Sequence, residues 1–97
     1  MARYRLTQQA QAELRQIYLD SVSTFGMAQA DRYAAGLRAV FEFLADNPRA
    51  ARERRDVDPP VRIHPYQAHV VIYATDELGV LILRIRHGRE DWLDQPV

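Results

Sequence analysis

Residues able to do chemistry are concentrated in positions 84–91, RIRHGRED, where three arginines, one histidine and two acids occupy eight positions. Histidine is the side chain best suited to proton transfer near neutral pH. Arginine is permanently charged and pairs bidentately with carboxylates or phosphates. The segment is therefore a candidate for phosphodiester cleavage, which needs a proton-transfer group and cations around the scissile phosphate. It is also a candidate for docking an acidic or nucleic-acid-bearing partner, which is the interpretation we favour.

Other site chemistries find little support in the sequence. The chain has no cysteine, which excludes disulfides and thiolate catalysis. Its three histidines, at positions 64, 69 and 87, do not have metal-ligand spacing. Its four glycines form no phosphate-binding loop. We therefore expect neither a metal nor a cofactor.

Length and charge set further bounds. With 97 residues, the chain is expected to form a single domain over residues 1–97. Its 13 basic residues, all arginine, balance 13 acidic ones, and a net charge of zero argues against a general nucleic-acid binder. No apolar run approaches the length of a membrane span, and the N-terminus MARYRLTQQ lacks the apolar core of a signal peptide. The expected location is the cytoplasm.

The first half of the chain has the pattern of a short strand followed by two helices. Tyr4 and Leu6 alternate with arginines, and Thr7 is a plausible helix N-cap. Apolar side chains then recur at helical spacing on both sides of Gly26, which is suited to end the first helix. The two apolar stripes are Leu14, Ile17, Tyr18, Val22 and Phe25, then Ala30, Tyr33, Ala34, Leu37, Phe41 and Leu44. Because the connection is short, the two helices should form an antiparallel hairpin.

The second half has the pattern of strands. After Asp46-Asn47-Pro48 ends the second helix, the segment RAARERRDVDPP has no apolar periodicity and is expected to be a loop. VRIH, HVVIYA and VLILRIRH then predict three strands. The element order β-α-α-β-β-β, with helices and strands segregated, predicts an α+β fold in which the helical hairpin covers one face of a small, mostly antiparallel sheet.

Alternation along the strands predicts which side chains share a face of the sheet. We expect the face covered by the helices to carry Tyr4, Leu6, Val61, Ile63, Leu81, Leu83, Ile85 and His87. The opposite face is then expected to carry five arginines: Arg3, Arg5, Arg62, Arg84 and Arg86. Such a face would attract an anionic partner despite the zero net charge. The alternative is that these arginines pair with acids of the same chain, in weak exposed ion pairs.

The whole pattern resembles the ParE branch of the RelE/ParE toxin superfamily. The resemblance lies in YRLTQQAQAELRQIYLDSVSTFG, in LADNP at the end of the second helix, in VRIHPYQAHVVIYA and in VLILRIRHGRED. It implies the toxin of a type II toxin–antitoxin module, which blocks DNA gyrase, stabilises cleaved DNA and is not itself an enzyme. It also implies a hetero-oligomeric complex, in which a ParD-like antitoxin wraps its C-terminal segment around the toxin. A module that only binds its antitoxin and has lost toxicity is an alternative.

Candidate residues for binding gyrase or the antitoxin are the five arginines together with Arg89, Trp92 and Phe43. Phe43 lies off the main apolar stripe of the second helix, so it is either a partner contact or the closing residue of the core edge. Trp92 has the same two interpretations, as a partner anchor or as a cap on the core.

The RelE-like branch, whose members cut messenger RNA on the ribosome, is a second functional alternative. Its candidate catalytic residues are Arg62, Arg84, Arg86 and His87, with His64 as a second proton-transfer group. The sequence departs from that branch in having no lysine and in ending DWLDQPV, without the terminal tyrosine or histidine of such nucleases. The alternation also points His87 towards the helices, away from the arginines.

Overall fold

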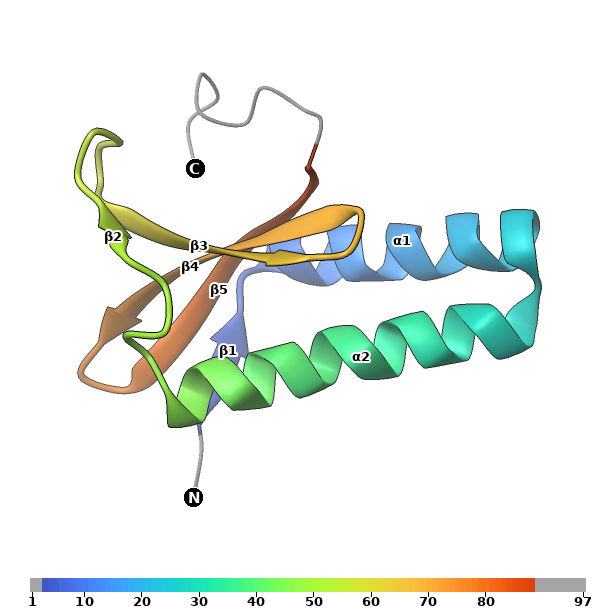
Figure 1. Ribbon diagram of the computed structural model, residues 1–97, viewed down its shortest axis with the longest axis horizontal. Helices are drawn as coiled ribbons and strands as arrows, with labels where there is room; N and C mark the ends of the chain where they lie inside the picture. The colour runs from blue at the N-terminus through green and yellow to red at the C-terminus, as the bar shows by residue number, and fades with distance from the viewer. Residues whose placement is uncertain (1–2, 89–97) are drawn as a thin grey trace.

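The computed structural model describes residues 3–88 and contains a helical hairpin packed on a five-stranded sheet (Figure 1). The elements are β1 (Tyr4–Leu6), α1 (Gln8–Phe25), α2 (Met27–Asp46), β2 (Glu53–Arg54), β3 (Val61–Tyr66), β4 (His69–Asp76) and β5 (Gly79–His87). The strand order is β1-β5-β4-β3-β2, with β1 parallel to β5 and the other neighbours antiparallel. The predicted α+β fold is confirmed, with β2 as a short additional strand inside the expected loop.

The helical hairpin forms where its local signals predict. Thr7 is the N-cap of α1, and its Oγ1 accepts a hydrogen bond of 3.0 Å from the Ala10 N–H. Gly26 separates the helices with a φ of 90°, a conformation that glycine adopts without steric cost. The part of the hairpin that contains this turn projects beyond the sheet (Figure 1), and Phe25 there is 62% exposed. The end of the predicted α1 stripe therefore does not enter the core.

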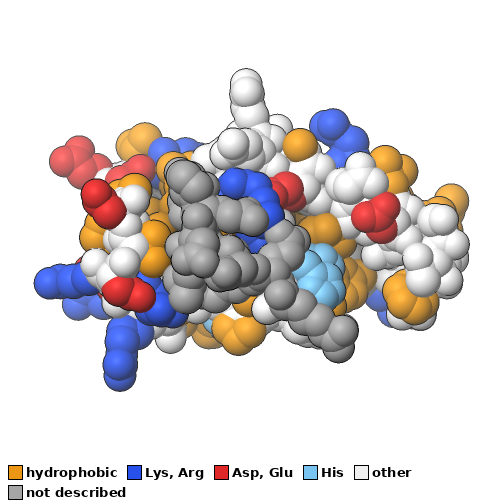
Figure 2. Space-filling model, turned by 90° about the horizontal axis from the view of Figure 1, so that it is seen from above, with side chains coloured by type: hydrophobic (Ala, Val, Ile, Leu, Met, Phe, Trp, Pro, Cys, Tyr) orange, Lys and Arg blue, Asp and Glu red, His pale blue; other side chains and the backbone are white. Residues whose placement is uncertain are grey.

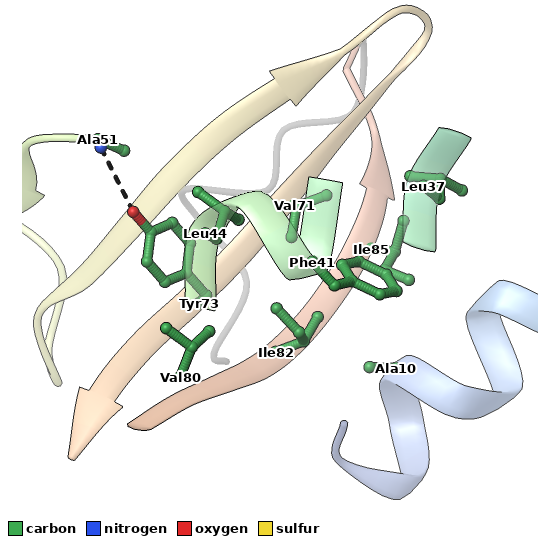
Figure 3. Packing of buried hydrophobic residues seen from close by; sticks show 10 residues of the cluster. All are labelled: Ala10, Leu37, Phe41, Leu44, Ala51, Val71, Tyr73, Val80, Ile82 and Ile85. Atoms are coloured by element: carbon green, nitrogen blue, oxygen red, sulfur yellow. Dashed lines mark hydrogen bonds between the residues drawn. The ribbon is translucent and has the colours of Figure 1, made fainter. Parts of the chain in front are cut away.

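The main core lies between the hairpin and the sheet (Figure 3). Its buried members are Ala10, Leu37, Phe41, Leu44, Ala51, Val71, Tyr73, Val80, Ile82 and Ile85. The ring tip of Tyr66 lies against Gly36 of α2, in space that a Cβ would occupy. Gly36 therefore lets a side chain of β3 approach α2 closely.

A second, smaller apolar cluster covers the other face of the sheet. It contains buried Val61, Val70 and Ile72, with Ile63 and Leu83 packed against it. The prediction that Val61 and Ile63 face the helices is therefore wrong. Alternation shows which residues share a face, but both faces of this sheet are apolar, so the pattern did not indicate which one the helices cover.

The face predictions for β5 fail for a different reason, an irregularity in the β4–β5 register. Tyr73 pairs with Ile82 and the preceding Ile72 pairs with Arg84, which leaves Leu83 as an extra residue in a β-bulge. Alternation therefore shifts by one at this point. The prediction that Leu83 faces the helices is wrong.

Helix-facing side chains of β5 are consequently Val80 and Ile82 before the bulge and Ile85 after it. Leu81, expected on the helix-covered face, lies between Val80 and Ile82 in the sequence and so on the opposite face, which makes that prediction wrong as well. The predicted direction of Ile85 and of His87 is confirmed, because His87 pairs with His69, whose ring contacts Tyr33 of α2. Neither helix within residues 3–88 combines the length and hydrophobicity needed to cross a bilayer.

Candidate partner-binding surface

Arg84 and Arg86 converge on one carboxylate, that of Glu13 in α1. Arg84 donates to it from Nε at 3.1 Å and from Nη2 at 2.8 Å, and Arg86 Nη1 lies 3.6 Å from Glu13 Oε2. The same carboxylate accepts the backbone N–H of Ile85 at 2.9 Å. The side chains of the two arginines are each 17% exposed, and that of Glu13 is 21% exposed. These three side chains form an internal ionic cluster, which we call the Glu13 cluster.

The other three arginines predicted for the same face lie in three different environments. Arg5 donates two hydrogen bonds, of 2.6 and 2.7 Å, to the Asp76 carboxylate, and these bonds lower the pKa of Asp76. Arg62 pairs with Tyr73 in the sheet, so it lies on the helix-facing side, where it donates to the Ala51 carbonyl at 2.6 Å. Arg3 is exposed. The prediction that five arginines share one face is wrong, because Arg62 lies on the other side.

The charge pattern over the visible surface agrees with this dispersal. In Figure 2, basic and acidic side chains are interspersed at the end of the molecule that carries the sheet. Apolar side chains reach the surface towards the opposite end, where α1 meets α2 (Figures 1 and 2). Arg89 and Trp92, the remaining predicted contacts next to β5, lie outside the described residues.

The four residues predicted to be catalytic, Arg62, Arg84, Arg86 and His87, do not come together, although His64 shares the helix-facing side of β3 with Arg62. Arg62 pairs with Tyr73 of β4, whereas His87 pairs with His69 of the same strand. These two positions are four residues apart along β4, which corresponds to about 13 Å. Arg84 and Arg86 are held by Glu13, on the other face from His87. The arrangement therefore lacks the common reaction centre that proton transfer and phosphate stabilisation require.

His87 instead belongs to an aromatic group on the helix-facing side. Its ring lies 5.5 Å from that of His69, and the Nδ1 atom of His69 is 2.7 Å from the Tyr33 hydroxyl. Burial raises the pKa of Tyr33, which keeps the phenol protonated. Next to this group is a hollow of about 230 Å³, which Phe25 and Gln67 also line.

Phe43 is exposed, as its position off the stripe suggested. It remains 47% accessible, and its ring lies 5.9 Å from that of His64 on β3. It lines a hollow of about 430 Å³ at the C-terminal end of α2. The interpretation of Phe43 as the closing residue of the core is not supported by this exposure.

The sequence patterns did not indicate two features of this surface. Glu13 had no assigned role, although it lies one residue before Leu14 of the apolar stripe, where an acid is placed to reach the edge of the sheet. Arg49 and Arg52 were assigned only to a loop. Both are exposed, and neither makes an ion pair within residues 3–88. Charge runs in the sequence do not distinguish paired arginines from available ones.

The arrangement of two helices on a mixed five-stranded sheet recurs in a solved structure titled as the chromosomal ParDE toxin–antitoxin system from P. aeruginosa. The match has a TM-score of 0.76 at 21% identity and covers 90% of this chain and 96% of that chain. This similarity establishes the fold class.

Sequence comparison identifies the family. A family model described as the ParE toxin of the type II toxin–antitoxin system parDE matches residues 4–92. Toxin ParE1 of Mycobacterium tuberculosis is 31% identical over 91 residues, covering 93% of each chain. Toxin ParE1 of Caulobacter vibrioides is 32% identical over 87 residues, covering 90% of each. The chain belongs to the ParE toxin family of type II toxin–antitoxin modules.

Proposed function

We propose that this ParE-family toxin inhibits DNA gyrase and is held inactive in a hetero-oligomeric complex with a ParD-like antitoxin. The observation that carries the proposal is the match of the ParE family model to residues 4–92, over nearly the whole chain. The proposed place of action is the cytoplasm, where gyrase and its DNA substrate are found.

The distribution of exposed apolar side chains supports antitoxin binding. Phe25 and Met27 at the turn of the hairpin are 62% and 64% exposed, and Phe43 at the other end of α2 is 47% exposed. Phe25 and Met27 lie together at the turn, and a group of exposed apolar residues on a small domain is typical of a surface covered by a partner. We propose that the antitoxin covers part of this surface.

The activity is tested by adding the purified protein to gyrase with relaxed plasmid, and separately to a translating ribosome system. Loss of supercoiling together with trapped cleaved DNA is the expected result. Cleavage of messenger RNA on the ribosome, with gyrase unaffected, would replace the proposal by the nuclease alternative. Silence in both assays, with tight antitoxin binding, would identify a non-toxic binding module.

Arginine contacts to gyrase are tested with Arg3→Glu, because Arg3 is exposed next to β1 and its side chain makes no ion pair within the described residues. Arg15→Glu, a charge reversal at an exposed position of α1, is the matched control. We expect Arg3→Glu to weaken inhibition and Arg15→Glu to leave it unchanged. Equal effects would show that only total charge matters. Arg89→Glu and Trp92→Ala test the proposed contacts beyond β5 in the same assay.

A further inference from the structure

We propose that the hollow at the C-terminal end of α2 binds an acidic peptide segment through an apolar anchor side chain. We call it the Phe43 hollow, and it is lined by Phe43, Asn47, Pro48, Arg49 and Ala50. Its volume of about 430 Å³ is enough for a large aliphatic or aromatic side chain and part of its backbone. The proposal follows from how the hollow is built and from the charges at its rim.

The wall formed by residues 48–51 is fixed from beneath by the core. The hydroxyl of buried Tyr73 donates to the Pro48 carbonyl at 2.9 Å. It accepts the Ala51 N–H at 3.3 Å, the bond drawn in Figure 3. Burial raises the pKa of this phenol, which keeps it protonated as a donor. Arg62 holds the same segment through the Ala51 carbonyl. A loop already held in one conformation loses little conformational entropy when a ligand binds.

The apolar floor comes from the end of α2. Asn47 caps the helix, since its backbone N–H and its side-chain Nδ2 both donate to the Phe43 carbonyl, at 2.9 and 3.0 Å. This cap fixes the last turn of α2 and with it the backbone position of Phe43. The ring is tilted against His64 of β3 and remains 47% exposed. An aromatic side chain held in this way offers a contact surface at low entropic cost.

The rim carries available positive charge. Arg54 and Arg55 are engaged by Asp56 and Glu53, at 2.8 and 2.9 Å. Arg49, which lines the hollow, is exposed and has no ion-pair partner within residues 3–88. A carboxylate on a bound peptide can therefore pair with it bidentately.

The same loop carries a second such arginine, Arg52, which is also exposed. Acidic Glu42 and Asp46 lie exposed on α2 near the hollow, and they would repel a continuous row of phosphates. The mixture of cations and anions around an apolar hollow thus favours a peptide with separated carboxylates over a nucleic acid.

Within the proposed function, the antitoxin is the source of such a peptide, and this assignment alone rests on that proposal. Binding at the hollow is measurable without gyrase or antitoxin. A failure to inhibit gyrase would therefore not contradict peptide binding at the hollow. A failure to bind the peptide would likewise not contradict gyrase inhibition.

The test uses the full chain, labelled with ¹⁵N, and three probes: a short peptide alternating glutamate and leucine, a glutamate-only peptide of equal length, and oligothymidine. We expect the glutamate–leucine peptide to shift the amide resonances of Phe43, Asn47 and Ala50, and to bind at least about tenfold more tightly than the other two probes. Preference for oligothymidine would overturn the proposal in favour of a nucleic-acid surface. Equal affinity for the two peptides, or no shifts at these residues, would also overturn it.

Variants locate the contact. Phe43→Ala and Arg49→Glu are each expected to weaken binding of the glutamate–leucine peptide at least about tenfold. Arg15→Glu, the same charge reversal at an exposed position of α1, is expected to leave affinity within about twofold, because isolated exposed charges are strongly screened. The thermal unfolding of all variants is measured in parallel. Unchanged binding by both hollow variants, with the fold intact, would contradict the proposed site.

Discussion

Two pairs of arginines in this protein differ in their exposure and in their ion pairing. Arg84 and Arg86 come from the most highly charged stretch of the sequence, yet they are largely buried and bound by Glu13. Arg49 and Arg52 come from an irregular loop, yet they are exposed and make no ion pair within the part of the chain that the structure describes. The difference lies in whether an acid from a distant part of the chain folds next to them.

This contrast bears on where the partners proposed for this toxin could bind. The Glu13 cluster joins α1 to β5, so its charges stabilise the toxin itself. The loop arginines add little to the fold and stand beside an apolar hollow. Charge available to a partner is therefore expected at the end of α2 more than along β5.

Glu13→Ala should have the largest effect on stability. It removes a carboxylate that both Arg84 and Arg86 contact, and with it the side-chain acceptor of the Ile85 N–H. Breaking a largely buried ion pair from one side is strongly destabilising, so we expect a loss of about 3 kcal/mol in the free energy of unfolding. Tm should fall by more than about 10 °C. Urea denaturation measures the loss. Glu42→Ala, at an exposed position of α2, is the control. If Glu13→Ala changed the free energy of unfolding as little as Glu42→Ala, the Glu13 cluster would be no stronger than an exposed surface ion pair.

Tyr73→Phe tests the other region by detaching the wall of the Phe43 hollow. The variant keeps the ring but removes the hydroxyl that serves Pro48 and Ala51. We expect a loss of about 1–2 kcal/mol, because a buried N–H and a carbonyl lose their partner. Binding of the glutamate–leucine peptide should weaken as well, which separates this variant from Glu13→Ala. Undiminished peptide binding would mean that the wall does not need this anchor.

Arg49→Glu and Arg52→Glu should change the free energy of unfolding by less than about 0.5 kcal/mol each, because both side chains are exposed and make no ion pair within residues 3–88. Denaturation midpoints of the two variants and of the parent protein measure this. A loss above about 1 kcal/mol would remove the distinction between the two pairs of arginines.

The smallest effect on stability is expected from the exposed Arg5–Asp76 pair, whose contribution depends on pH. Hydrogen bonds from Arg5 lower the pKa of Asp76 in the folded state below its value in the unfolded chain, about 3.9. The pair therefore stabilises the fold above that pH, and this contribution disappears as pH falls through the lowered pKa. Denaturation midpoints between about pH 6 and pH 2 should fall less steeply for Asp76→Asn than for the parent protein. Parallel curves would show that Asp76 does not contribute to acid sensitivity.

The element order and the helical hairpin could be predicted from the sequence because their signals are local. Thr7 caps α1 through a residue three positions away, and Gly26 ends the helix through its own backbone freedom. The α2 stripe repeats at helical spacing, and its buried members, among them Leu37 and Phe41, form one side of the core. Each of these features depends on a few neighbouring residues.

The faces of the strands could not be predicted, because they depend on long-range packing. Alternation correctly grouped Val61 with Ile63, but a second apolar cluster beyond the sheet reversed their direction. The bulge at Leu83 changes the register in the middle of an unbroken apolar run, with no glycine or proline to signal it. Glu13 and Arg84 are 71 residues apart, and neither residue type indicates its partner. The predictions of which sheet face a residue lies on failed wherever they depended on these features.

The Glu13 carboxylate also bears on whether copies of the protein can associate through their sheet edges. β1 pairs with Val80–Ile82 alone, so within residues 3–88 the following backbone of β5 forms a sheet edge, and such edges are templates for aggregation. Thr7 Oγ1 donates to the Leu83 carbonyl there, and Glu13 accepts the Ile85 N–H. A foreign strand would have to displace a carboxylate held by two guanidinium groups. We infer that one acid on α1 hinders edge-to-edge pairing of the folded protein, in addition to the stability expected from its ion pairs.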